Sequence, residues 1–122
     1  MKTKKFNPQK KTSLLIGRFQ PFHRGHYKLF LNGLRKCGQV AILIMDSYNI
    51  NKKNPFKYKD VKTKINNQLK AYKNQYILIK IPVTGEVIYG RKVGYKIRKI
   101  TLSKKIQSIS ATKIRRSLKL NK

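Results

Sequence analysis

Acidic residues are almost missing from this chain. Its 122 residues include 31 Lys and Arg but only three Asp and Glu, so the formal net charge at pH 7 is +28. An A- and T-rich genome would explain the lysines but not the missing glutamates, whose codons suit such a genome as well. Self-repulsion at this charge destabilises a compact fold in low salt. We therefore expect a polyanionic partner, such as a nucleic acid, a ribosome-like assembly or nucleotides.

Cysteine and long apolar runs are also scarce. The single cysteine, Cys37, excludes an intramolecular disulfide and a cysteine metal cluster. Too few further ligands accompany the two histidines for a zinc site, and no Ser-His-Asp set for nucleophilic catalysis is available. No apolar run approaches the roughly 18 residues of a membrane span, and the N-terminus has no secretory apolar region. We expect a cytoplasmic protein with no membrane partner.

The chain length and the position of the lysines suggest a simple domain organisation. Residues 1–11 ("MKTKKFNPQKK") form a basic N-terminal arm. Residues 12–122 are long enough for one compact domain with a modest core and too short for two.

Apolar periodicity predicts strands alternating with helices. A helix begins near Gly25 and ends at Cys37-Gly38, and a second is marked by apolar residues spaced from Val61 to Tyr72. The expected strands are 12–19, 39–46 and 75–83, followed by short β-prone pieces within 85–102 and a terminal helix in 109–120.

This order of elements predicts an α/β fold. Strands that read as continuous apolar runs and alternate with helices indicate a parallel sheet with helices on both faces. In such sheets ligands bind at the carboxyl ends of the strands, near helix N-termini. This rule brings together the segments 17–28, 46–56 and 108–116.

The segment "GRFQPFHRGHYKLF" contains the residues best suited to bind phosphate. Gly25 and His26 stand where the first helix begins, so free backbone N–H groups and the helix dipole would point at an anion. His23 and His26 could present imidazole N–H donors to the same phosphate. Lys28 and Arg18 add positive charge. A lone surface histidine is usually incidental, but two around a glycine between a strand and a helix favour a phosphate site.

Other polar residues on the same edge allow two interpretations. Ser110 and Thr112 are hydroxyl donors at a predicted helix start, with Arg115 on the same face for bidentate phosphate contact. Equally, they could be an N-cap and a solvated basic face. Asp46 follows the second strand, where it could bind ribose or a hydrated metal, or cap the next turn.

Two of these segments resemble a known pair of signatures. "GRFQPFHRGH" (17–26) is similar to the HxGH signature of the nucleotidyltransferase superfamily, and "ISATKIRRSL" (109–118) to its ISxTxIR signature. They occur in the family's order, about ninety residues apart. Between them, "MDSYNINKKNPF" and "VIYGRKVGY" resemble small adenylyltransferase- and cytidylyltransferase-like proteins, and "NPF" resembles nicotinamide-mononucleotide adenylyltransferases.

The resemblance implies a Rossmann-like α/β domain that transfers a nucleotidyl group from a nucleoside triphosphate to a phosphorylated acceptor and releases pyrophosphate. Carried over by position, His23 and His26 would stabilise the α-phosphate and the departing pyrophosphate. The β- and γ-phosphates would be held by Ser110, Thr112 and Arg115.

The remaining family roles fall on residues near the histidines. Arg18 and Lys28 would be auxiliary cations, and Gly17 with Phe19 would shape the nucleotide pocket. The resemblance implies Mg²⁺ carried by the triphosphate, with ATP favoured over CTP, and a homo-oligomer by analogy. The charge keeps a second interpretation open, in which a basic nucleic-acid- or ribosome-associated structural protein retains this fold.

Overall fold

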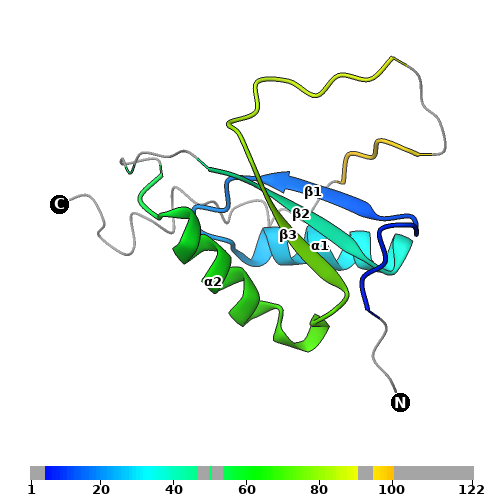
Figure 1. Ribbon diagram of the computed structural model, residues 1–122, viewed down its shortest axis with the longest axis horizontal. Helices are drawn as coiled ribbons and strands as arrows, with labels where there is room; N and C mark the ends of the chain where they lie inside the picture. The colour runs from blue at the N-terminus through cyan, green and yellow to red at the C-terminus, as the bar shows by residue number, and fades with distance from the viewer. Residues whose placement is uncertain (1–4, 47–49, 51–53, 91–94, 101–122) are drawn as a thin grey trace.

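Three parallel strands form the sheet of this protein. The computed structural model describes four stretches of the chain, residues 5–46, 50, 54–90 and 95–100. The strands are β1 (Ser13–Gly17), β2 (Val40–Met45) and β3 (Tyr76–Ile81), in the order β1-β2-β3 (Figure 1). Leu15 pairs with Ile42 and Ile42 with Leu78, so alternate residues of all three strands share one face. The predicted parallel α/β sheet is confirmed for these three strands.

Helix α1 (Arg24–Cys37) connects β1 to β2. It ends at Gly38, whose φ of 83° is a left-handed conformation that glycine adopts at little cost. A Cβ on Gly33 would lie 2.9 Å from the Cβ of Ser13, so glycine there lets the helix approach β1 closely. The structure confirms the predicted helix, which begins one residue earlier than expected.

Helix α2 (Tyr58–Gln68) and the short 3-10 helix η1 (Lys70–Tyr72) connect β2 to β3. Val61, Ile65 and Leu69 recur at helical spacing and are at most 3% exposed. They therefore form the apolar stripe that buries this connection in the core. The helix predicted from this spacing is confirmed.

Both helices cover the same face of the sheet (Figure 1). The ring of Phe30 on α1 packs edge-to-face on Tyr72 of η1 and Tyr76 of β3, with centroids 5.5 and 5.9 Å apart. Between helices and sheet lies a core whose fully buried members include Phe30, Ile42, Ile65 and Leu69. The expectation of helices on both faces depends on the terminal helix predicted in 109–120, which lies outside the described residues.

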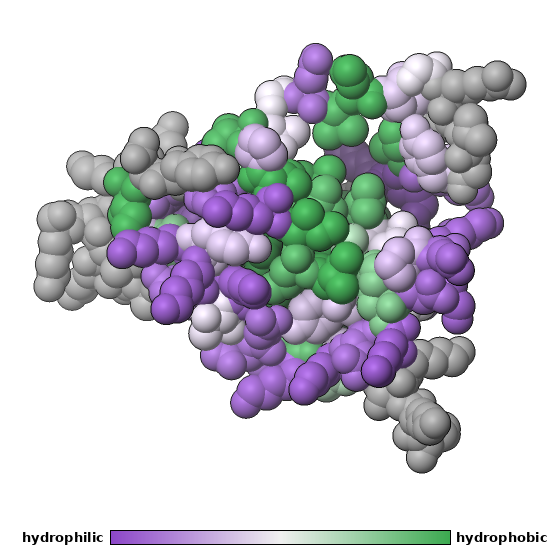
Figure 2. Space-filling model, in the orientation of Figure 1, coloured by the Kyte–Doolittle hydropathy of each residue, from purple (hydrophilic) through white to green (hydrophobic). Residues whose placement is uncertain are grey.

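The opposite face of the sheet is apolar and partly accessible. Leu14 and Ile16 of β1 are 64% and 37% exposed, and Ile79 of β3 is 40% exposed. Figure 2 shows hydrophobic residues gathered over the strands on the side facing the viewer. Half-buried and exposed residues alternate along β1, as in a strand covered on one face.

The short strands predicted within 85–102 are wrong for the residues that the structure describes there. Residues 85–90 and 95–100 contain neither strand nor helix. Val87 and Ile88 are 66% and 80% exposed. Their β propensity produces no strand because propensity reflects packing against neighbouring strands, and these side chains bury little surface.

The second half of the basic arm contacts the amino end of the sheet. Gln39, which is 6% exposed, donates from Nε2 to the carbonyl oxygen of Asn7 at 2.8 Å and to Thr12 Oγ1 at 2.6 Å. Its Oε1 accepts from the Asn7 N–H at 3.0 Å. One buried amide therefore holds the arm against β2.

Among the residues described, no helix is long and apolar enough to cross a membrane.

Candidate active site

Two histidine side chains close the first turn of α1. His23 precedes the helix, and its Nδ1 accepts the backbone N–H of Gly25 at 3.0 Å. In return, Nδ1 of His26 accepts the backbone N–H of His23 at 3.1 Å. The two rings stack with centroids 3.8 Å apart and planes at 27°. This is a reciprocal capping box built from imidazoles, and it fixes both rings side by side beyond the carboxyl end of β1.

These backbone bonds determine which nitrogen of each ring carries the proton. A neutral imidazole that accepts at Nδ1 is protonated at Nε2. Within the described residues, neither Nε2 atom of His23 or His26 has a hydrogen-bond partner. The site thus presents two N–H donors on stacked rings. The expectation that the Gly25 N–H is free for an anion is wrong, because His23 Nδ1 accepts it.

Burial keeps both rings neutral. It lowers the pKa of His26 to about 3, with a smaller contribution from the neighbouring His23. Burial also lowers the pKa of His23. At pH 7 the pair therefore donates hydrogen bonds without carrying charge, and a bound polyphosphate would raise both pKa values by favouring the charged form.

Phe19 packs behind His26. Its ring lies edge-on to the imidazole, with centroids 4.9 Å apart, and the side chain is 2% exposed. A Cβ on Gly17 would lie 2.9 Å from Phe19 Cε1, so the ring fills the space above that glycine. Phe19 has a φ of 53°, in the left-handed region where non-glycine residues are uncommon. We expected Phe19 to shape the pocket directly, whereas here it supports His26 from the core.

Gln20, which nothing in the sequence indicated, joins the turn after β1 to the segment after β2. The side chain is 5% exposed. It donates from Nε2 to the carbonyl oxygen of Phe56 at 3.0 Å and accepts the Phe56 N–H at 2.9 Å. Gln68 of α2 similarly donates to the carbonyl oxygen of Phe22 at 3.0 Å. These bonds bring the segments predicted at 17–28 and 46–56 together.

Asp46 forms an ion pair at the end of β2. Its Oδ2 lies 3.2 Å from Nζ of Lys80, and its side chain is 12% exposed. Nζ of Lys80 also lies 5.2 Å from the ring centroid of Tyr58, at the start of α2. Asp46 thus joins β2 to β3 through Lys80, which in turn contacts α2. The sequence did not indicate that Lys80 is the partner of Asp46.

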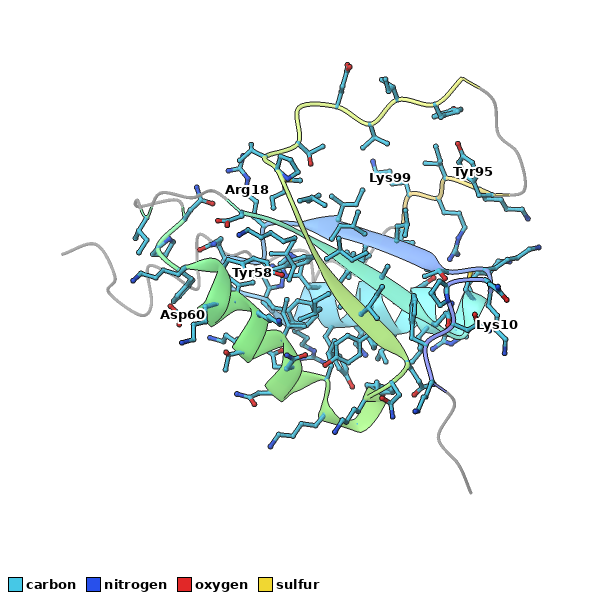
Figure 3. The ribbon with its side chains drawn as sticks, viewed as in Figure 1. Lys10, Arg18, Tyr58, Asp60, Tyr95 and Lys99 are labelled. Carbon is cyan, nitrogen blue, oxygen red and sulfur yellow. The ribbon has the colours of Figure 1, made fainter. Side chains whose placement is uncertain are left out.

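The two auxiliary cations are placed differently. Arg18 directly follows β1 and is exposed at the same end of the sheet as Tyr58 (Figure 3). Lys28 is also exposed, but it lies two residues beyond His26 on α1. Residues two apart on a helix are separated by about 200° and do not share a face. The structure therefore brings Arg18 to this edge and does not join Lys28 to the histidine pair.

The second half of the expected site, Ser110, Thr112 and Arg115, lies outside the described residues.

The described residues offer little to a protein-bound metal. Within 5–46, 50, 54–90 and 95–100 no three His, Cys, Asp or Glu side chains come together. Of the two carboxylates near this edge, Asp46 is engaged by Lys80 and Asp60 lies in the first turn of α2. These residues fit a metal that arrives on its nucleotide better than one held in a protein cage.

Solved structures with a similar fold include two of one bacterial enzyme. Both are described as a bifunctional NMN adenylyltransferase/ADP ribose pyrophosphatase from Francisella tularensis, one of them complexed with AMP and a manganese ion. Each matches with a TM-score of 0.56 and 30% sequence identity over 62% of this chain. The chain spans 23% of the length of that protein.

Sequence comparisons narrow this likeness to a family. No curated protein sequence matches the chain. A family model described as cytidylyltransferase-like matches residues 14–78, which run from β1 through the histidine pair and both helices into β3. That match covers more than half of the chain. The chain also has a parallel α/β arrangement like that of the NMN adenylyltransferase structures. Together these findings confirm the nucleotidyltransferase resemblance. The chain belongs to the cytidylyltransferase-like family.

Proposed function

We propose that this protein transfers a nucleotidyl group, AMP rather than CMP, from a nucleoside triphosphate to a phosphorylated small molecule and releases pyrophosphate. The observation that carries the proposal is the stacked pair of His23 and His26, whose Nδ1 atoms are both occupied by backbone N–H groups. The substrate is the Mg²⁺ complex of the triphosphate, and the reaction takes place in the cytoplasm. The preference for AMP is supported by the NMN adenylyltransferase structures, whose enzyme resembles this chain over 62% of its length.

The chemistry requires no general base. An oxygen of the acceptor phosphate attacks the α-phosphorus, the bond from that phosphorus to the bridging oxygen breaks, and pyrophosphate leaves with the electron pair. Because the acceptor phosphate is already an anion at pH 7, no proton has to be removed. Catalysis then consists of in-line positioning and stabilisation of charge on the phosphate oxygens. A chain with three acidic side chains can meet both requirements.

The two Nε2–H groups would stabilise the charge that develops on the α-phosphate and the leaving pyrophosphate. They are held in place before substrate binds, since each ring is fixed by a backbone bond and His26 also by Phe19 and Phe22. Donors that need no reorganisation are the more effective kind.

The roles of the other site residues are inferred from their positions in the fold or in the second signature. Arg18 supplies positive charge at the edge, and Gly17 with Gly25 allows close packing around the pair. Ser110, Thr112 and Arg115 would bind the β- and γ-phosphates, as the second signature implies. Lys28 has no direct role in this scheme, because it leaves α1 on a different face from His26.

Two substitutions at His26 separate the donor from the cap. His26→Asn keeps an acceptor near the position of Nδ1, so the bond from the His23 N–H survives, but the Nε2–H is lost. His26→Gln keeps an N–H donor near the position of Nε2 but loses the acceptor for the His23 N–H. We expect His26→Asn to lower the rate of pyrophosphate release at least 100-fold, the scale of a lost charge-stabilising donor. His26→Gln should retain more activity and lose more thermal stability. Lys36→Ala, at the exposed far end of α1, is the control and should match the unaltered protein.

The assay measures pyrophosphate from ATP and from CTP with NMN, glycerol 3-phosphate and other phosphorylated acceptors. Turnover with ATP and one acceptor supports the proposal. No turnover with any triphosphate would overturn it, and equal activity in His26→Asn and the unaltered protein would overturn the assignment of the site.

A second candidate function is supported by the distribution of lysine. Six exposed lysines follow one another along α2 and its flanks. In that case the chain retains the family's fold as a basic component that associates with nucleic acid. Steeply salt-dependent RNA binding without turnover would favour it.

A further inference from the structure

The connection between β2 and β3 carries a surface of unneutralised positive charge. Its exposed lysines are Lys57, Lys59, Lys62, Lys64, Lys70 and Lys73. In the part of the chain that the structure describes, none of the six forms an ion pair. The one acid in this stretch, Asp60, lies in the first turn of α2. Exposed like charges at this spacing repel each other, and an external polyanion would relieve the repulsion.

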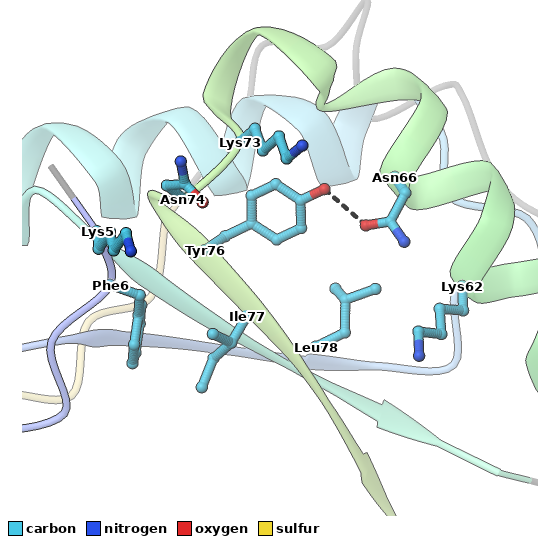
Figure 4. Close-up of a pocket in the computed structure, with 9 residues that line it drawn as sticks. All are labelled: Lys5, Phe6, Lys62, Asn66, Lys73, Asn74, Tyr76, Ile77 and Leu78. Carbon is cyan, nitrogen blue, oxygen red and sulfur yellow. Dashed lines mark hydrogen bonds between the residues drawn. The ribbon is translucent and has the colours of Figure 1, made fainter. Parts of the chain in front are cut away.

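This basic surface borders a pocket at the amino end of β3. The pocket is open, has a volume of about 540 Å³ and is lined by nine residues (Figure 4). Three of them are lysines from separate segments, Lys5 of the arm, Lys62 of α2 and Lys73 after η1. A volume in this range accommodates a nucleotide-sized group.

The interior of the pocket combines rings with hydrogen-bond donors. Phe6 and Tyr76 contribute aromatic surface, and Ile77 and Leu78 add apolar surface beside them. The Tyr76 hydroxyl donates to Asn66 Oδ1 at 2.6 Å, which leaves the amide N–H groups of Asn66 as donors. None of the nine residues that line the pocket is acidic. The lining therefore suits a planar ring with an anionic group attached.

The basic arm contributes half of the aromatic surface. Phe6 precedes Asn7, whose N–H and carbonyl oxygen are both bonded to the buried side chain of Gln39 at 3.0 and 2.8 Å. These two bonds hold Lys5 and Phe6 across the pocket from Asn66 (Figure 4). The arm is thus ordered at the point where it faces the pocket.

We propose that this pocket and the α2 lysines bind single-stranded nucleic acid. One base packs against Phe6 and Tyr76, and the flanking phosphates contact Lys5, Lys62 and Lys73. A lysine surface alone would accept any polyanion, but a pocket with aromatic walls requires a base that is free to leave its stack. That is the property of a single strand and not of a duplex.

The pocket lies apart from the candidate active site, although the basic surface also includes Lys57 and Lys59 at the start of α2, on the active-site edge. The histidine pair lies beyond the carboxyl ends of the strands, whereas Tyr76 is the first residue of β3. A six-residue strand separates the two ends by roughly 17 Å. Changes confined to the pocket should therefore weaken nucleic-acid binding and leave nucleotidyl transfer unchanged.

The test is the fluorescence anisotropy of labelled oligo(U) on the full chain, titrated with salt. The variant Lys62→Gln/Lys73→Gln removes two charges from the pocket. The control Lys96→Gln/Lys99→Gln removes two exposed charges from segment 95–100, away from α2 (Figure 3). We expect the pocket variant to bind at least about tenfold more weakly in low salt, with a salt slope reduced by about 1.4, the value for two lost phosphate contacts. The control should change affinity by less than about twofold.

A second variant tests the base. Phe6→Ala should weaken oligo(U) binding about tenfold, within the range for one lost stacking contact, and leave binding of a hairpin duplex unchanged. Equal losses in the pocket and control doubles would overturn the proposal, because bulk charge alone would explain them. Competition by polyglutamate as effective as that by oligo(U) would also overturn it, as would duplex binding as tight as single-strand binding.

Discussion

The two ends of the sheet are built from opposite chemistry. At the carboxyl end, His23 and His26 are neutral, stacked and bonded to the backbone. At the amino end, Lys62 and Lys73 are exposed and form no ion pair within the described residues. Yet each end has one buried glutamine whose side chain bonds to the backbone of another segment. It is Gln20 at the carboxyl end and Gln39 at the amino end.

The difference shows how a very basic chain can contain two kinds of anion site. A catalytic site needs hydrogen-bond donors at fixed positions. Burial and backbone hydrogen bonds fix the two imidazoles, but burial also keeps them uncharged. A site for a flexible polymer needs attraction over some distance, which exposed lysines provide because they stay charged and mobile. In the two proposals, phosphate would be bound by desolvated neutral rings at one end and by solvated cations at the other.

The largest expected effect is a loss of folding stability at low pH, which we attribute to the histidine pair at the carboxyl end of the sheet. In the unfolded chain His26 has a pKa near 6.5, and in the folded protein it is lowered to about 3. Between these values the unfolded state binds more protons, so stability is greatest above pH 6.5 and falls as the pH drops toward 3. The loss approaches roughly 1.4 kcal/mol per pH unit. Urea unfolding at several pH values measures it.

Two variants sharpen this comparison. His26→Gln should reduce the pH dependence, because only the smaller contribution of His23 remains. Lys62→Gln/Lys73→Gln should leave it unchanged, since both lysines line the pocket at the amino end of β3, away from the histidine pair. With only three acidic side chains in the sequence, few other groups compete for the effect. The same slope in His26→Gln as in the unaltered protein would contradict the assignment.

The next effect compares Gln20, at the carboxyl end of the sheet, with the more exposed Gln68. Gln20→Ala leaves the backbone N–H and carbonyl of Phe56 without their side-chain partner, and we expect a loss of about 2 kcal/mol of stability together with reduced pyrophosphate release. Gln68→Ala removes a single bond, to Phe22, from an exposed side chain and should cost about 1 kcal/mol or less. Thermal unfolding and the pyrophosphate assay measure the two. Equal losses would show that Gln20 is not what joins the two segments.

The smallest effect on turnover is expected at the other buried glutamine, Gln39. Gln39→Ala releases the arm from β2 and should lower stability by about 1 kcal/mol. Oligo(U) affinity should fall, because Lys5 and Phe6 lose their position, whereas turnover should stay within about twofold of normal. A parallel loss of turnover would show that the two ends of the sheet are coupled.

Much of the fold could be predicted because its signals are local. Gly38 ended the predicted helix at the right place, since a left-handed residue after an amphipathic run favours glycine. The periodicity of Val61, Ile65 and Leu69 likewise predicted a buried helix face. The β-prone residues Val87 and Ile88 led to the wrong prediction of a strand. A strand forms only where a neighbouring strand pairs with it, and β propensity alone does not show whether one is present.

The candidate site was predicted in part. The sequence singled out His23 and His26 but not the tautomer that their backbone bonds impose, and it treated Phe19 as a pocket wall. It did not reveal the partner of Asp46, because Lys80 lies on another strand.

What the sequence by itself determined is the excess of positive charge, the order of strands and helices, and the pairing of two histidines at a helix start. All of these depend on composition or on residues close together in the chain. The tertiary structure alone decided that both rings are neutral donors and that Gln20 joins the turn after β1 to the segment after β2. It also decided that Gln39 holds the arm against β2 and that Phe6 and Tyr76 line one basic pocket. Burial and contacts between distant segments produce these features, and neither exists until the chain has folded.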